Sequence, residues 1–185
     1  MRKKQNFLGI NPNKVSEDEV KNYLIERLNE VKKSGKITNL VDFHSTNKFM
    51  IMAHDQEKLK TLGNIVASYK KISFSEILKK YEIHFRKSLE NQPTIKKHSN
   101  VILHIFGFFS KNLNQFEKKI FLDIFEKYKM GIISLGEILS EIHPIIFKFD
   151  KTYLASQTYF LLYADTQEGI LFEFLSNESV KKNTK

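Results

Sequence analysis

Two histidines and a lysine stand at helical spacing in the segment 42–54, and side chains of these types can bind phosphate or exchange protons. His44 and Lys48 are four residues apart, which places them on one face of a helix, with Asn47 beside them. His54 falls at the expected end of the same helix, where the helix dipole favours its protonated form. The segment therefore predicts an anion-binding or acid–base face. The alternative is a solvated helix face with a capping histidine.

A second set of polar residues follows one face of the apolar segment 94–109. Most of its last nine residues are aliphatic or aromatic, which predicts a helix buried in the middle of the fold. At about 100° per residue, five polar or small residues fall within one quadrant: Lys97, Asn100, His104, Gly107 and Lys111. Asn100 can read a base edge and His104 can donate to phosphate. Alternatively, both satisfy loop carbonyls inside the fold.

The start of this helix carries an unusual charge. Thr94 suits the N-cap position, and Lys96, Lys97 and His98 follow in the first turn. Each cation there opposes the helix dipole by roughly 0.3–1 kcal/mol, whereas a bound anion is favoured. The other recognisable helix starts of the chain are acidic. This start therefore predicts an anion site.

Aromatic and amide side chains gather late in the chain, at Tyr153, Gln157, Tyr159 and Tyr163. Exposed tyrosines near basic residues can stack on nucleobases. The alternative is that the rings pack inside the fold and only their hydroxyl groups reach water.

Several kinds of chemistry are excluded by residue type. The chain has no cysteine, which excludes disulfides, thiol catalysis, and iron–sulfur or zinc–thiolate sites. Its six histidines include no pair three or four residues apart, so we predict no metal site and no cofactor. The sequence has neither a glycine-rich phosphate loop nor a nucleophile elbow, and no catalytic residue is assigned.

Helical periodicity and helix-start signals organise the chain from Ser16 onward. Capping-box sequences stand at Ser16, Ser73 and Asn114, and a second helix is expected over about residues 39–53. Asp55 and Asp150 are expected to cap further helices, the latter reaching Gln157, and Pro144 predicts a bent or interrupted helix over about 135–147. No alternating pattern indicates strands. We therefore predict an all-α single domain, a bundle of about seven to eight helices around a central buried helix.

Length and charge set the broad class. A chain of 185 residues is long enough for one domain with its own core. A net charge of +9 and a pI near 9.5 point to a polyanion such as nucleic acid, although a lysine-rich, AT-biased composition raises the pI without any function. No stretch approaches the roughly 20 apolar residues of a membrane span, so we expect a cytoplasmic protein without membrane contact.

Three of these segments together resemble the YbgA family of bacterial proteins in residue types, order and spacing. The matching sequences are Phe43-His44…Lys48…Met52-Ala53-His54, His98-Ser99-Asn100-Val101…His104…Gly107-Phe108-Phe109, and Tyr153…Gln157…Tyr159. The resemblance divides the chain into an N-terminal basic segment with the first helix (1–41), a YbgA-like helical domain (42–166) and a C-terminal segment with a basic tail (167–185). One departure follows Tyr159, where the family's Pro-Tyr-Pro turn is replaced by Leu162-Tyr163-Ala164.

The resemblance also implies a functional context. In the YbgA family this domain occurs alone and also fused behind a desulfidase-type domain, which removes sulfur from thiolated uracil or from thiouridine in tRNA. That resemblance implies that the YbgA-like part presents nucleic acid while the partner carries out the chemistry. Because this chain has no cysteine for the partner's iron–sulfur cluster, it does not perform that desulfuration itself.

The sequence therefore predicts a nucleic-acid-binding module, with tRNA as the expected target and no catalysis of its own. The expected nucleic-acid or anion-binding residues are His44, Lys48, His54, Lys96, Lys97, His98, Asn100, His104, Tyr153, Gln157 and Tyr159. One alternative is an enzyme that uses the histidines and Lys48 as an acid–base site for a nucleobase or a phosphorylated substrate. The other is an interaction module for a separate desulfidase or another nucleic-acid enzyme.

Overall fold

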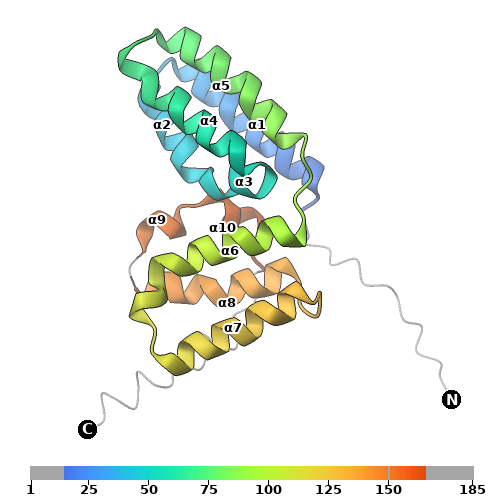
Figure 1. Cartoon of the computed structure of the whole chain (residues 1–185). Coiled ribbons are helices and arrows are strands. Elements are labelled where there is room, and N and C mark those ends of the chain that lie inside the picture. Colours follow the sequence, from blue (N-terminus) through green and yellow to red (C-terminus); the bar gives the residue numbers. More distant parts are fainter. Residues whose placement is uncertain (1–14, 150, 166–185) are drawn as a thin grey trace, which may run out of the picture.

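Helices account for the regular structure of the described chain. The computed structural model describes residues 15–149 and 151–165, and these residues form ten α-helices, two short 3-10 helices and no strand (Figure 1). The predicted all-α fold is confirmed. The elements are α1 (Glu17–Ser34), α2 (Ile37–Thr46), α3 (Lys48–His54), α4 (Gln56–Ala67), η1 (Ser68–Lys70), α5 (Phe74–Leu89), α6 (Ile95–Phe109), η2 (Ser110–Asn112), α7 (Gln115–Lys129), α8 (Leu135–Lys148), α9 (Thr152–Ala155) and α10 (Thr158–Tyr163). Expectations for residues 1–14, for Asp150 as a cap and for residues 166–185 lie outside the described residues.

Side-chain caps fix where the longer helices begin. The predicted capping boxes at Ser16–Glu19 and Asn114–Glu117 are present, and each satisfies two backbone donors reciprocally. A further box at Ser134–Glu137 begins α8. At Ser73 only half of the predicted box forms, because the Ser73 side chain accepts from the Glu76 amide without the reciprocal bond. These caps explain why the observed starts of the capped helices agree with the starts predicted from the sequence.

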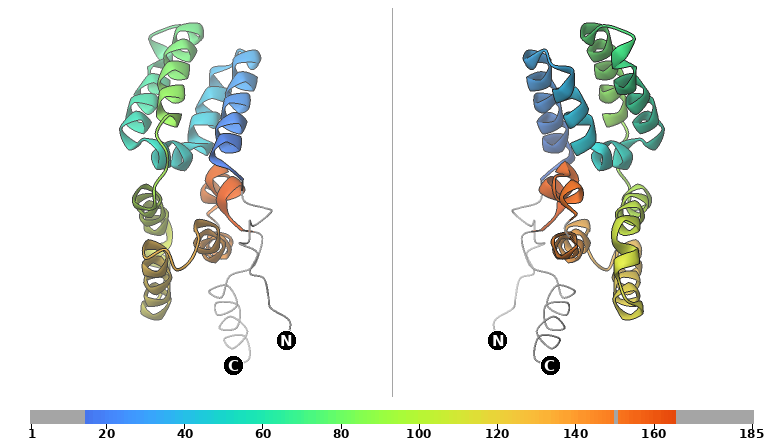
Figure 2. Two further views of the ribbon diagram at one scale, coloured as in Figure 1. Left: turned by 90° about the vertical axis from the view of Figure 1, so that its right-hand side faces the viewer. Right: turned by 90° about the vertical axis from the view of Figure 1, so that its left-hand side faces the viewer.

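The helices form two groups with a junction between them (Figures 1 and 2). In the first group α1, α2, α4 and α5 pack side by side as a four-helix bundle. In the second group α6, α7 and α8 pack on one another. The short helices α3 and α10 join the groups, since α3 packs against both α4 and α6, and α10 packs against both α3 and α8.

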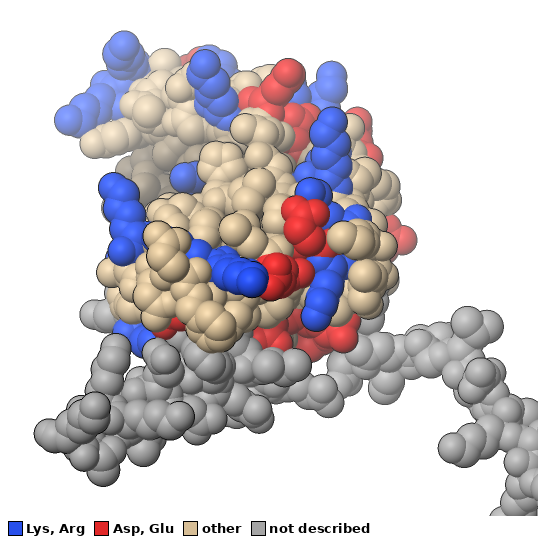
Figure 3. Space-filling model, turned by 60° about the horizontal axis from the view of Figure 1, so that its bottom comes forward, with Lys and Arg blue, Asp and Glu red and all other residues tan. Residues whose placement is uncertain are grey.

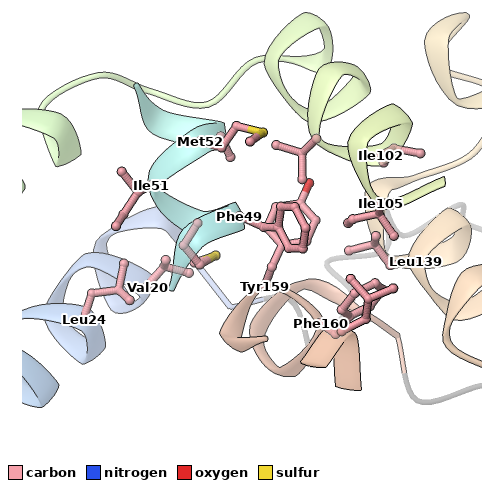
Figure 4. Close-up of a cluster of buried hydrophobic side chains, with 14 of the residues drawn as sticks. Val20, Leu24, Phe49, Ile51, Met52, Ile102, Ile105, Leu139, Tyr159 and Phe160 are labelled. Atoms are coloured by element: carbon pink, nitrogen blue, oxygen red, sulfur yellow. The ribbon is translucent and has the colours of Figure 1, made fainter. Parts of the chain in front are cut away.

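One hydrophobic core runs through this junction. Figure 4 shows side chains of α1, α3, α6, α8 and α10 converging there, including Val20, Phe49, Ile105, Leu139 and Tyr159. All five are fully buried. Because α1 contributes to the same core as the YbgA-like region, the first helix is packed into the fold and is not a separate unit.

Helix continuity differs from the prediction in three places. The single helix expected over 39–53 is two helices that meet at Asn47, whose side chain donates to the Phe43 carbonyl at 2.8 Å. Asparagine offers the backbone such local alternatives, which favours a break. Conversely, α8 continues through Pro144, so of the predicted bend or interruption the interruption does not occur. The buried apolar face of α8 holds the helix together. The helix expected to reach Gln157 ends at Ala155, and α10 begins anew at Thr158.

α6 occupies a central position but is buried on one face only. It packs against α3, α7 and α8, and its core side chains are His98, Val101, Ile102, Ile105 and Phe109. Leu103 and Phe108 are exposed on the other face, so the prediction of a helix surrounded by core is wrong in this respect. Large apolar side chains left in water on a central helix mark a candidate contact surface.

Candidate nucleic-acid interface

The three segments that carry the sequence motifs meet at the junction of the two helical groups. α3 packs against both α6 and α10, and α9 immediately precedes α10 in the chain (Figure 1). Residues more than 100 positions apart are joined directly, since the Gln157 amide nitrogen donates to the Ser45 carbonyl at 2.9 Å. The motif residues are therefore assembled in one region of the fold.

One exposed surface of this region combines aromatic and basic side chains. The ring centroids of Phe108 and Tyr153 lie 5.8 Å apart, and Phe108 meets the buried ring of Phe49 edge-on at 6.2 Å. Lys48 places its Nζ 5.9 Å from the centre of the Phe49 ring. Phe108 and Tyr153 are 42% and 36% exposed. We call this set the aromatic–basic surface: Lys48, His104, Phe108, Lys111 and Tyr153.

His104 and Lys111 extend the surface along α6 and into η2. His104 precedes Phe108 by four residues and therefore shares its helix face. It is exposed and makes no hydrogen bond to another residue of the described ranges. Lys111 is also exposed. Figure 3 shows basic side chains around a hollow at the left, while basic and acidic side chains are interspersed towards the right. The left-hand side is where α9 and the end of α6 lie in Figure 1.

His44 lies away from this surface. Its ring is half-buried against α4 and α5, where Nδ1 is 3.1 Å from the Tyr81 hydroxyl, and Gly63 leaves room for the Nε2 edge. Burial lowers the pKa of His44, and the charge of Lys48 lowers it further. The sequence predicted that His44, Asn47 and Lys48 share one solvated helix face. In the structure they do not share a face, because the helix breaks at Asn47 and the Asn47 side chain is buried.

Lys97 explains the unusual charge at the start of α6. Thr94 caps the helix as predicted, accepting from the Lys97 amide at 3.3 Å. The Lys97 ammonium group donates to the carbonyls of His54 at 2.7 Å and Gln92 at 3.1 Å. His54 is the last residue of α3, so the lysine lies at the negative end of that helix. The attraction between the Lys97 ammonium group and the C-terminal end of α3 offsets the repulsion between Lys97 and the N-terminal end of α6. Lys96 is exposed and has no such partner among the described residues.

Replacing Lys97 with methionine removes the ammonium group and keeps the apolar stem. The His54 and Gln92 carbonyls then lose a charged donor, so we expect the free energy of unfolding to fall by about 1–2 kcal/mol. Urea unfolding followed by circular dichroism measures this. The matched control is Lys96→Met, expected within about 0.5 kcal/mol of wild type. Equal losses in the two variants would contradict the capping role.

His54 is completely buried at the end of α3. Its Nδ1 donates to the Asn91 carbonyl at 2.8 Å, and its Nε2 lies 3.8 Å from a carboxylate oxygen of Glu17. Burial lowers its pKa to about 4; the charges of Lys21 and Lys97 act in the same direction, against the Asn91 carbonyl. The imidazole is therefore neutral at pH 7. The expectation that the helix dipole keeps it protonated is wrong, because desolvation outweighs the dipole.

The remaining motif residues connect helices. The His98 ring is buried, and its Nδ1 lies 2.7 Å from the hydroxyl oxygen of Tyr159. The Tyr159 side chain is fully buried. Burial raises the pKa of Tyr159 well above its usual value, so this hydroxyl stays protonated. Asn100 donates to the Gln56 side chain at 3.0 Å, tying α6 to the start of α4. Together with Gln157, these residues position the helices whose outer faces form the aromatic–basic surface.

Phe108 is the surface residue that sequence reasoning missed. It lies about 40° from His104 on the helix wheel, just beyond the edge of the quadrant that was assigned to polar residues. Its apolar side chain was counted with the core of a buried helix. The useful signal was the combination of its place next to the polar quadrant with a basic residue, Lys111, three positions later.

No group of three or more His, Asp or Glu side chains in residues 15–149 and 151–165 is placed to hold a metal ion. Among the helices of those ranges, none has the length and apolar character that crossing a membrane requires.

The fold and the assembled motifs define an all-α domain whose characteristic residues meet at one junction. The family described as "Protein of unknown function (DUF1722)" matches residues 48–164, well over half of the chain, so the chain belongs to this family. It is also 24% identical, over 143 residues, to the "Uncharacterized protein YbgA" of Escherichia coli (strain K12), an alignment that covers 76% of this chain and 85% of that protein. The predicted YbgA-family membership is confirmed. No solved structure matches the chain.

Proposed function

We propose that this protein binds RNA, with tRNA as the expected target, through the aromatic–basic surface. The observation that carries the proposal is the exposed ring pair Phe108–Tyr153, contributed by two motif segments. Lys48 of the third motif segment lies over Phe49, the ring that Phe108 contacts. The exposed parts of these two adjacent rings form an apolar patch that a ligand can cover. A ligand with flat apolar faces and negative charge can stack on the exposed rings and pair with the basic side chains.

Unpaired bases and phosphates of a folded RNA meet these requirements. Bases in loops are unstacked and can lie on aromatic rings, a contact worth roughly 1–3 kcal/mol per base. Lys48 and Lys111 can each neutralise a phosphate, and exposed His104 can donate to one. The net charge of +9 favours encounter with a polyanion. Stacking supplies affinity without strict sequence preference, which suits a module that presents RNA.

Replacing Phe108 with alanine is expected to weaken tRNA binding by about 5- to 100-fold, corresponding to one lost stacking contact. Tyr153→Ala should have an effect of the same order. Filter binding or fluorescence anisotropy with total tRNA measures the dissociation constant. The matched control is Tyr69→Ala, because Tyr69 is 47% exposed and carries Lys70 over its ring, at the far end of the four-helix bundle between α4 and α5.

The salt dependence of binding tests the basic residues separately. Affinity should fall with a log–log slope of roughly −0.7 to −0.9 per phosphate neutralised, and Lys48→Gln or Lys111→Gln should reduce the slope by roughly one contact. Absence of binding at low salt, or a Tyr69→Ala loss equal to that of Phe108→Ala, would overturn the proposal.

A further inference from the structure

The stretch of sequence that follows α10 is acidic within a basic chain. Residues 166–180, which we call the acidic–aromatic segment, contain three glutamates and no lysine or arginine, so their net charge is −3 in a chain of +9. Five of the seven residues 169–175 are aliphatic or aromatic, including Phe172 and Phe174. Side chains of this kind favour a surface that covers them. The segment offers what an RNA offers, which is negative charge together with flat apolar rings.

The residue immediately before this segment is held against α8. The Asp165 amide donates to the Gly136 carbonyl at 3.3 Å, and the Ser140 hydroxyl is shared between the carbonyls of Gly136 at 2.9 Å and Asp165 at 2.8 Å. A glycine is needed for this approach, because a Cβ atom at position 136 would overlap the Asp165 carboxylate. The acidic–aromatic segment therefore starts from a fixed point on the N-terminal half of α8.

The aromatic–basic surface lies within reach of that point. From Ser140 to the end of α8 the helix rises about 12 Å. α9, which carries Tyr153, packs against α8 and begins four residues after α8 ends. Phe172 follows Asp165 by seven residues, and seven extended residues span up to about 23–25 Å. The segment is therefore long enough to bring its rings to the surface.

We propose that the acidic–aromatic segment occupies the aromatic–basic surface until RNA displaces it, an inference that rests on the proposed function. Phe172 and Phe174 cover the apolar patch of Phe108 and Tyr153, while Glu173 between them faces the basic side chains. Exposed ion pairs contribute little and are screened by salt, so burial of the rings holds the docked segment.

A docked segment of the same chain acts as a built-in competitor for RNA. It is present at a high effective concentration because it is tethered close to the surface. A ligand that makes one weak contact does not displace it, whereas a folded RNA that stacks several bases and neutralises several phosphates does. The segment thereby raises the affinity that an RNA needs in order to bind.

A spin label on the full chain tests the docking without RNA. Because the chain has no cysteine, Ser176→Cys provides a single labelling site. A nitroxide at this site broadens the NMR signals of residues close to it. Docking should broaden the signals of residues 104–111 and 152–155 more than those of residues 130–133, which directly precede α8 and its contact with Asp165. A tethered segment that does not dock broadens residues 130–133 at least as strongly.

The variant with both Phe172→Ala and Phe174→Ala removes the two rings without a charge change. With the label attached, it should lose the preferential broadening of residues 104–111. Without the label, it should bind total tRNA about tenfold more tightly than wild type, as expected when the segment is docked about 90% of the time. The matched control is Ile83→Ala, which truncates a 57% exposed apolar side chain of α5 and should stay within twofold of wild type.

Two outcomes overturn the inference alone. The first is broadening of residues 104–111 in wild type that does not exceed that of residues 130–133. The second is tRNA binding of equal affinity to wild type and to the variant that lacks both rings. If tRNA binds to neither chain, the proposed function fails and the inference fails with it, whatever the label reports.

Discussion

Replacing Tyr159 with alanine is expected to lower the free energy of unfolding by about 3–5 kcal/mol. The ring is fully buried at the junction and lies near three other rings, those of His98, Phe160 and Tyr163. α10, which carries it, packs against α3 and α8 and so connects the two helical groups. The truncation leaves a cavity where these groups meet, and rigid helices on both sides limit how far it collapses.

The variant Tyr159→Phe separates hydrogen bonding from packing. It keeps the ring and removes only the hydroxyl group, which lies 2.7 Å from Nδ1 of His98. The expected loss is about 1 kcal/mol, the usual net value of one hydrogen bond. The difference between the two variants then measures what the ring contributes by packing.

Urea unfolding followed by circular dichroism gives both values. Exposed Tyr69→Ala serves as the control and should stay within about 0.5 kcal/mol of wild type. A loss for Tyr159→Ala no larger than that of the control would mean that this ring does not hold the junction together.

The helices were largely predictable because their signals are local. A capping box needs residues three positions apart, as at Ser16 and Asn114, and an apolar stripe such as that of α1 repeats within one turn. The break between α2 and α3 was missed because it depends on whether the Asn47 side chain bonds its own helix or points to solvent.

The candidate site was less predictable because its contacts are distant in sequence. Lys97 reaches a carbonyl 43 residues away, and His98 reaches a hydroxyl 61 residues away. Spacing along one helix identifies a polar face but does not say whether that face meets water or another helix. Of the residues predicted from sequence, Lys48, His104 and Tyr153 lie on the aromatic–basic surface, while His54, His98, Gln157 and Tyr159 are buried.

Acidification is expected to destabilise the protein through His54. Its pKa is about 4 in the folded state and roughly 6.5 in an unfolded chain. Above that unfolded value the ring is neutral in both states and contributes no pH dependence. Between the two values the unfolded state binds more protons, so stability falls as the pH falls. The loss is about 2 kcal/mol between pH 7 and 5, and approaches about 3 kcal/mol near pH 4.

The variant His54→Gln isolates this contribution. Glutamine does not titrate, so the variant should be less stable than wild type at pH 7 but should lose about 2 kcal/mol less on going from pH 7 to 5. Urea unfolding at pH 7, 6 and 5 supplies the values, and an NMR titration of the His54 ring reports its protonation directly.

The neighbouring carboxylate makes the result decisive. Glu17 Oε2 lies 3.8 Å from His54 Nε2, and Tyr163 donates to the other carboxylate oxygen at 2.8 Å. If the His54–Glu17 attraction exceeded the cost of burial, protonation would stabilise the fold and wild type would gain stability over His54→Gln as the pH fell from 7 to 5. A loss of stability shows that desolvation dominates. A pH dependence that is identical in wild type and His54→Gln would mean that His54 is not coupled to folding.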